Sequence, residues 1–174
     1  MVGPQRALPE DRRAEKKPRG TAKDRALGLL AVRWRSRREL ETRLRAAGFE
    51  PEQVETALGD LERAGLIDDD RFARELARAK SGRLDGNRNV RSALAKAGVA
   101  PQLSEQVLAD LGEEEERAHA LAERKAARMT GVAPEVAYRR LHGFLMRRGY
   151  APDLAREAAR RALAGLQDQE FADP

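Results

Sequence analysis

The sequence predicts an all-α protein of three tandem three-helix repeats in an elongated, curved arrangement, preceded by a disordered basic N-terminal tail. Glycines at positions 48, 98 and 149 stand roughly one every fifty residues. Each is followed by a bulky apolar residue, a spacer and a proline, and each has a leucine four positions before it. Glycine at a helix end can adopt the left-handed conformation, and proline suits the first turn of the next helix. The same helix–glycine–helix pattern therefore occurs three times, which is typical of repeat proteins that bind partners through an extended surface.

The first repeat is expected over residues 23–67. Its first helix runs from about Ala22 to Arg33, where apolar residues recur on one helical face. Ser36 and Glu39 have the spacing of a capping box, which predicts a second helix that ends near residue 47. A proline at position 51 then opens a third helix that reaches about residue 64.

The second repeat is expected over residues 68–112. Asp68 and Asp85 are the predicted N-caps of its first two helices, because aspartate accepts hydrogen bonds from the free N–H groups of a first turn. The three predicted helices lie near residues 69–81, 86–97 and 101–111.

The third repeat is expected over residues 113–166, followed by a C-terminal tail at residues 167–174. The acidic run from Glu113 to Glu116 favours the positive end of a helix dipole, and the predicted helix reaches Met129. Two further helices are predicted near residues 134–148 and 152–164.

Residues 1–22 predict a disordered basic tail, because prolines and glycines stand among charges with no apolar period. Most of the chain's net charge of +5 lies there. The tail is either a solubilising extension or an arm that binds nucleic acid or a partner. The chain contains no cysteine, and its first twenty residues contain no apolar run typical of a signal peptide or membrane span. We expect a cytoplasmic monomer without a membrane partner.

The segment GLIDDDRFA at residues 65–73 has a plain structural interpretation. Gly65 ends a helix, Leu66 and Ile67 pack, Asp68 caps the next helix, and Phe72 faces the core. Asp69 and Asp70 then lie in the first turn, where carboxylates complement the helix dipole. Successive side chains on a helix diverge by about 100 degrees, so these carboxylates do not converge on one cation. We therefore expect a structural motif and neither a metal site nor an acid catalyst.

The same segment resembles the RecX family, bacterial regulators of the RecA recombinase. The resemblance also rests on Arg35-Ser36-Arg37-Arg38-Glu39-Leu40, on the pair Arg43-Leu44 and on the three glycine–apolar steps, and it covers roughly residues 25–165. It implies an elongated helical protein that lies in the groove of a RecA filament on DNA, contacts adjacent protomers, and inhibits strand exchange and ATP hydrolysis. The chain departs from the family at Ala93, where relatives often have glutamate, and in its long tail. The structural motif comprises Gly48, Gly65, Asp68, Asp69, Phe72, Gly98 and Gly149.

Residues that would indicate an enzyme do not form a pattern. His119 and His142 fall in different predicted helices, and no His-Glu-x-x-His motif is present. The sequence also lacks a glycine-rich phosphate loop and a nucleophile elbow around its serines. We expect no catalytic residue, no metal and no cofactor.

Basic residues gather at corresponding places in the three repeats. If the repeats stack, these clusters form one stripe that meets RecA or DNA phosphates, although each is also explained as a solvated face. Trp34 is either an exposed anchor of that surface or a side chain that closes the first core. The candidate partner-binding residues are Arg33, Trp34, Arg35, Arg37, Arg38, Arg78, Lys80, Arg83, Arg88, Arg91, Arg139, Arg140, Arg147 and Arg148.

Two alternative functions remain open at this point. A tandem helix-turn-helix DNA-binding protein also has short helices around a turn, and its helix after the turn enters the major groove. That helix carries several acids in the first two repeats, Glu105 and Asp110 among them, which phosphates repel. The other alternative is a helical-repeat adaptor without any connection to nucleic acid. The sequence also leaves open whether RecA is inhibited, disassembled or stimulated.

Overall fold

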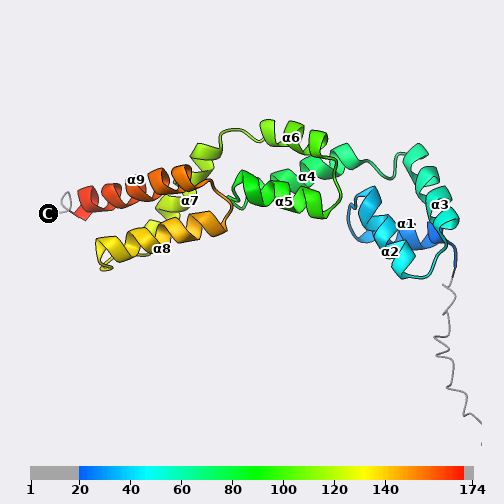
Figure 1. The fold of residues 1–174 in the computed structure, drawn as a ribbon, viewed down its shortest axis with the longest axis horizontal. Coiled ribbons are helices and arrows are strands. Elements are labelled where there is room, and N and C mark those ends of the chain that lie inside the picture. The colour runs from blue at the N-terminus through cyan, green and yellow to red at the C-terminus, as the bar shows by residue number, and fades with distance from the viewer. Residues whose placement is uncertain (1–19, 171–174) are drawn as a thin grey trace, which may run out of the picture.

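The computed structural model describes residues 20–170, which form nine α-helices and no strand. The helices follow one another in an elongated, gently arched row, as Figure 1 shows. The all-α class and the tandem arrangement are as predicted. Residues 1–19 of the predicted basic tail and residues 171–174 of the predicted C-terminal tail lie outside the described residues. The exact limits of the three predicted repeats stay predictions.

The first unit consists of α1 (Ala22–Val32), α2 (Arg37–Ala46) and α3 (Pro51–Arg63). Its core gathers the apolar faces of all three helices around Leu40, Leu44 and Leu58, which are fully buried. Ala22 also belongs to this core, although it falls in the predicted tail. A capping box that the sequence analysis does not predict opens α1: the Thr21 hydroxyl accepts a hydrogen bond from the Asp24 N–H at 3.1 Å.

The second unit consists of α4 (Asp69–Ser81), α5 (Asn87–Lys96) and α6 (Pro101–Ala109). Phe72, Val90 and Leu94 lie in its buried core. Asp68 caps α4 as predicted, because its carboxylate accepts a hydrogen bond from the Arg71 N–H at 2.9 Å. The prediction for Asp85 is wrong, since the N-cap of α5 is the next residue, Gly86, which has no side chain to donate or accept.

The third unit consists of α7 (Glu114–Ala126), α8 (Pro134–Arg147) and α9 (Pro152–Glu170). Alanines of α7 and α9 pack closely around Leu141, Leu145 and Tyr150. Burial raises the pKa of Tyr150 to about 12, and its hydroxyl donates a hydrogen bond to the Leu84 carbonyl at 2.9 Å. The predicted end of the last helix at residue 164 is wrong, because α9 continues to Glu170. No proline interrupts the chain between Pro152 and that point.

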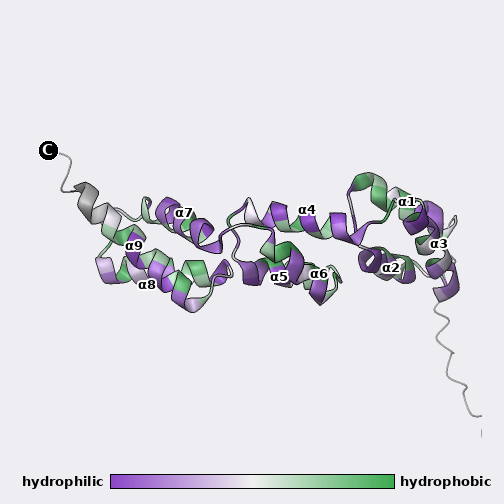
Figure 2. Cartoon of the chain, turned by 90° about the horizontal axis from the view of Figure 1, so that it is seen from above, coloured by the Kyte–Doolittle hydropathy of each residue, from purple (hydrophilic) through white to green (hydrophobic). Residues whose placement is uncertain are grey.

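The helices are amphipathic, and each unit has its own apolar cluster. Purple hydrophilic and green hydrophobic segments alternate along the row in Figure 2. Gly48, Gly98 and Gly149 have φ angles of 90°, 79° and 92°, so each adopts the predicted left-handed conformation at a helix end. In the GLIDDDRFA segment Ile67 is buried, but Leu66 is 43% exposed and does not pack as predicted.

The two junctions between units share one geometry. The amino end of α2 lies against the carboxyl end of α5, where the Ser36 hydroxyl donates a hydrogen bond to the Ala97 carbonyl. The amino end of α5 meets the carboxyl end of α8 in the same way: the Gly86 N–H donates to the Arg148 carbonyl at 2.8 Å. The middle helices therefore stack head to tail, and opposite ends of their dipoles face each other.

A carboxylate from the next unit completes each junction. The Arg37 N–H, in the first turn of α2, donates to the Asp69 carboxylate at 2.8 Å. The Asn87 N–H, in the first turn of α5, donates to the Glu114 carboxylate at 2.7 Å. These contacts satisfy N–H groups that a helix start leaves without partners. The acidic run that opens α7 thus binds the preceding unit in addition to complementing its own helix.

Close backbone approach at the second junction requires glycine at position 86. A Cβ atom there would lie 2.5 Å from the Gly149 carbonyl carbon and 2.6 Å from the Tyr150 nitrogen. Both are backbone atoms, so relief would require the second and third units to move apart.

We expect Gly86→Ala to lower the free energy of unfolding by about 1–3 kcal/mol, the usual cost of overpacking. Gly28→Ala is the matched control, because nothing lies within 4 Å of a Cβ atom there and alanine suits a helix interior. The thermal midpoint should fall for the first variant and not for the second. An unchanged midpoint for Gly86→Ala would contradict the close approach.

Candidate functional site

Arg35 is a predicted partner-binding residue that the structure places inside the molecule. It is 7% exposed, its Nε atom donates to the Leu29 carbonyl at 3.1 Å, and its guanidinium pairs with Glu39 at 2.5 Å. The prediction of an outward-facing Arg35 is therefore wrong. Its role is to fix the turn between α1 and α2.

Glu39 is the centre of this arginine cluster. Its carboxylate contacts Arg35, Arg33 at 2.5 Å and Arg43 at 3.2 Å. Burial alone would raise the pKa of Glu39, but the three arginines outweigh it and the pKa is lowered. Because its carboxylate contacts these side chains, Glu39 does not close the predicted capping box. Ser36 alone caps α2, accepting from the Glu39 N–H at 3.1 Å.

Arg37 and Arg91 bind acids of their own units. Arg37 contacts Glu55 at 2.7 Å and Glu62 at 2.8 Å, both on α3. Arg91 donates two hydrogen bonds, at 2.7 and 3.0 Å, to Glu105 on α6. The hydrogen bond to Glu105 raises the pKa of Arg91, and the paired charges partly cancel.

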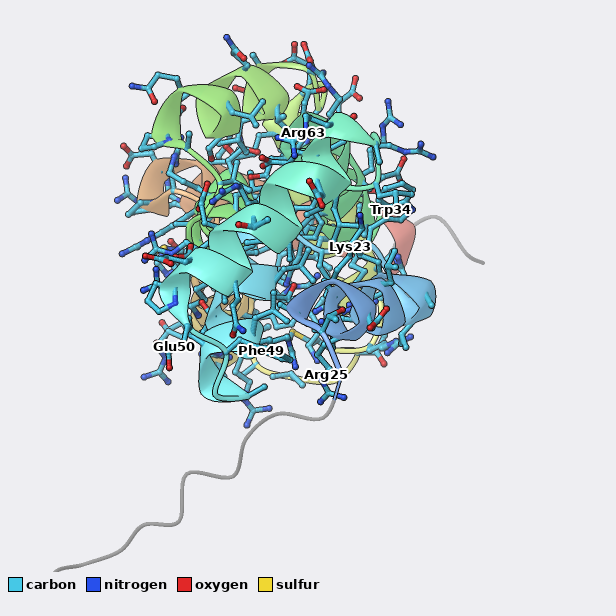
Figure 3. All side chains as sticks on the ribbon, turned by 90° about the vertical axis from the view of Figure 1, so that its right-hand side faces the viewer. Lys23, Arg25, Trp34, Phe49, Glu50 and Arg63 are labelled. Carbon is cyan, nitrogen blue, oxygen red and sulfur yellow. The ribbon has the colours of Figure 1, made fainter. Side chains whose placement is uncertain are left out.

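Trp34 lies at the side of the first unit, away from the turn at Phe49 and Glu50 (Figure 3). It is 40% exposed and takes no part in the buried core of that unit. The Arg71 guanidinium lies 4.4 Å from the centre of its ring, a cation–π distance. Trp34 therefore contacts α4 of the second unit and remains partly accessible.

Three more predicted residues form ion pairs. Arg148 donates to the Asp85 carboxylate at 2.9 Å, and Lys80 approaches the same carboxylate at 3.7 Å. Arg78 lies 3.6 Å from Glu75. Asp85 is 8% exposed, so its pair with Arg148 joins the second and third units at a largely buried place. This pairing explains why Asp85 does not cap α5.

Six predicted arginines are exposed and have no ion pair within the part of the chain that the structure describes. We call them the exposed arginine set. Arg140 and Arg147 are seven positions apart on α8 and share one helix face. The aliphatic part of Arg38 packs where Gly98 has no side chain. The exposed arginine set comprises Arg38, Arg83, Arg88, Arg139, Arg140 and Arg147.

Three cations at the carboxyl end of α7 are not among the predicted residues. Arg124, Lys125 and Arg128 line a hollow of about 200 Å³ together with Arg83 and Arg148. In the sequence they are the ordinary basic residues of a last helical turn, which complement the helix dipole. Only the stacking of the third unit on the second brings them next to Arg83.

The predicted acidic and histidine residues serve structural contacts. Asp70 pairs with Arg74 at 2.8 Å, which also binds Asp110 on α6. The buried Nδ1 of His119 and Nε2 of His142 have no hydrogen-bond partner among the described side chains. Within residues 20–165 no three His, Asp or Glu side chains lie close enough to hold a metal ion. Nor is any described helix both long enough and apolar enough to cross a membrane.

Comparison with known proteins identifies two segments of the chain. Residues 22–61 match the model of the first three-helix domain of RecX, and residues 113–159 match that of its third three-helix domain. The regulatory protein RecX of Amycolatopsis mediterranei is 36% identical over 155 residues, which cover 87% of this chain and 86% of the relative. That of Corynebacterium efficiens is 36% identical over 163 residues, covering 88% and 76%.

Solved structures give the same fold. The crystal structure of RecX from Lactobacillus salivarius superposes with a TM-score of 0.68 at 21% identity, covering 81% of this chain and 94% of that one. A second crystal structure, of regulatory protein RecX, has a TM-score of 0.67 and covers 80% of this chain.

The lowered pKa of Glu39 predicts a pH-dependent contribution to stability. At neutral pH we expect Glu39→Gln to lower the free energy of unfolding by about 1–3 kcal/mol, because charged hydrogen bonds are lost. A lowered pKa stabilises the folded state above the ordinary glutamate value of 4.5. That contribution disappears as the pH falls through the folded pKa. Thermal unfolding of both proteins should therefore show a difference that narrows below pH 4.5.

Glu52→Gln is the control for this series, since Glu52 is exposed and has no ion pair among the described residues. It should behave as wild type throughout. A Glu39→Gln effect that stays constant across the series would contradict the role assigned to the cluster.

Proposed function

This chain belongs to the RecX family, and from that premise we propose that it regulates RecA by binding in the groove of the RecA–DNA filament. There it contacts adjacent RecA protomers and inhibits strand exchange and ATP hydrolysis. It acts as a cytoplasmic monomer and carries out no reaction of its own. Two or more contacts along a filament raise the overall affinity, because the second contact is intramolecular once the first has formed.

The observation that carries this proposal is the row of three stacked units in Figure 1. A filament presents the same surface at regular intervals, and an elongated molecule contacts several intervals at once. Members of the exposed arginine set occur in every unit, from Arg38 on α2 through Arg88 on α5 to Arg139 on α8. Such charges steer a protein towards an acidic partner and set its orientation.

The helix-turn-helix alternative has less support. Two acids of α3, Glu55 and Glu62, together with Glu105 of α6, bind arginines of their own units. A major-groove helix requires outward donors at these positions. On α9, Arg160 and Arg161 are exposed, so the third unit alone has suitable charge on that helix.

We expect the protein, at stoichiometric or lower ratios to RecA, to reduce DNA-dependent ATP hydrolysis and to block strand exchange. A coupled ATPase assay on single-stranded DNA and a strand-exchange gel measure the two effects. Unchanged hydrolysis and exchange at saturating protein would contradict the functional proposal.

We also expect the double reversal Arg139→Glu with Arg140→Glu to weaken filament binding by tenfold or more, because two attractive charges become repulsive, a change of about 1.4 kcal/mol or more. Both side chains are exposed, so stability should change by about 0.5 kcal/mol or less for each. Co-sedimentation with RecA filaments measures binding.

The matched control reverses Arg160 and Arg161, which lie on α9 of the same unit and are also exposed. The RecA proposal predicts that this control binds filaments as wild type does. If the α9 reversal is the more damaging one, the helix-turn-helix function is favoured.

A further inference from the structure

The hollow at the junction of the second and third units gathers five cations from three segments. Arg83 comes from the turn before α5, Arg148 from the end of α8, and the others from the carboxyl end of α7. We define the basic hollow by its lining residues. They are Arg83, Leu121, Arg124, Lys125, Arg128, Phe144 and Arg148.

Two of these cations are held in fixed positions. The Arg148 Nε atom donates to the buried Asp85 carboxylate at 2.9 Å, and one terminal nitrogen donates to the Arg83 carbonyl. Lys125 and Arg148 lie 5.3 and 5.8 Å from the centre of the Phe144 ring. One aromatic ring thus supports two cations, and a buried acid orients one of them.

The remaining charge is not balanced by the protein. Arg83, Arg124, Lys125 and Arg128 form no ion pair within residues 20–165, and Asp85 already binds Arg148 and Lys80. Like charges that share a small hollow repel one another, and an anion placed among them removes that repulsion. The hollow is therefore a binding site for an anion.

The chemistry of the lining identifies the class of anion. Guanidinium groups offer pairs of N–H donors that match the oxygens of a phosphate. The volume of about 200 Å³ is below the 300–1,000 Å³ usual for small-molecule sites, yet Arg83, Arg124 and Arg128 are exposed to an approaching polymer. We propose that the basic hollow binds a backbone phosphate of nucleic acid, directly and without RecA.

The apolar part of the lining disfavours a protein partner and a base contact. Leu121 is buried, and the Phe144 ring lies against two cations. The hollow therefore lacks the accessible aromatic or apolar anchor on which protein interfaces depend. It also lacks a free ring on which a base could stack. Binding is expected to be independent of nucleotide sequence, as contacts to phosphates are.

The test uses the triple variant Arg83→Ala, Arg124→Ala, Arg128→Ala in the full chain. These exposed changes leave Arg148, Lys125 and Phe144 in place, and a thermal melt checks the fold. Fluorescence anisotropy with a labelled single strand and with the same sequence as a duplex measures affinity against salt. We expect affinity to fall tenfold or more, with a slope shallower by about 0.7 per lost single-strand phosphate contact or about 0.9 per duplex contact. The arm with the larger loss identifies the strand form that is bound.

The control replaces Arg25, Arg160 and Arg161 by alanine, which removes the same charge at exposed positions outside the hollow. It should bind nearly as wild type does. An equal loss in the control, or no loss in the triple variant, overturns the proposal. Displacement of DNA by polyglutamate at equal charge concentration also overturns it, since the hollow would then bind carboxylates equally well. RecA ATPase inhibition is measured separately, so failure of this proposal is distinct from failure of the proposed function.

Discussion

At both junctions the amino end of one middle helix lies against the carboxyl end of the next, and the order of the three units depends on this contact. It satisfies free N–H groups of one helix with the carbonyls of another, and a carboxylate from the following unit supplies a further acceptor. The backbones can approach only where no Cβ atom intervenes, as at Gly86. Glycine therefore ends helices within each unit and also allows adjacent units to dock.

This stacking divides the arginines into two groups with different roles. Arg35, Arg37 and Arg148 bind carboxylates or carbonyls inside the molecule and hold turns and junctions in place. The exposed arginine set and the cations of α7 have no such partner in the described part of the chain. Charge count alone does not separate the groups, since both have the same residue types at similar spacing. Proposals about RecA and DNA rest on the second group.

The sequence predicts the repeat well because its signals are local. The left-handed glycines, the prolines in first turns and the cap at Asp68 each depend on residues within one helical turn. Asp85 and Glu39 have equally good local signals, but each binds a cation elsewhere in the fold. Leu66 is apolar yet exposed, since the turn after Gly65 directs Ile67 to the core instead. The basic hollow is invisible in the sequence because Arg83 and Arg124 meet only when two units stack.

The most direct test of the account is a reconstruction by electron cryo-microscopy of RecA filaments on single-stranded DNA, decorated with this protein. The account predicts a continuous elongated density in the filament groove, in which all three units lie along adjacent RecA protomers in the order seen in Figure 1. Density confined to filament ends or to bare DNA, with an empty groove at saturating protein, would contradict it.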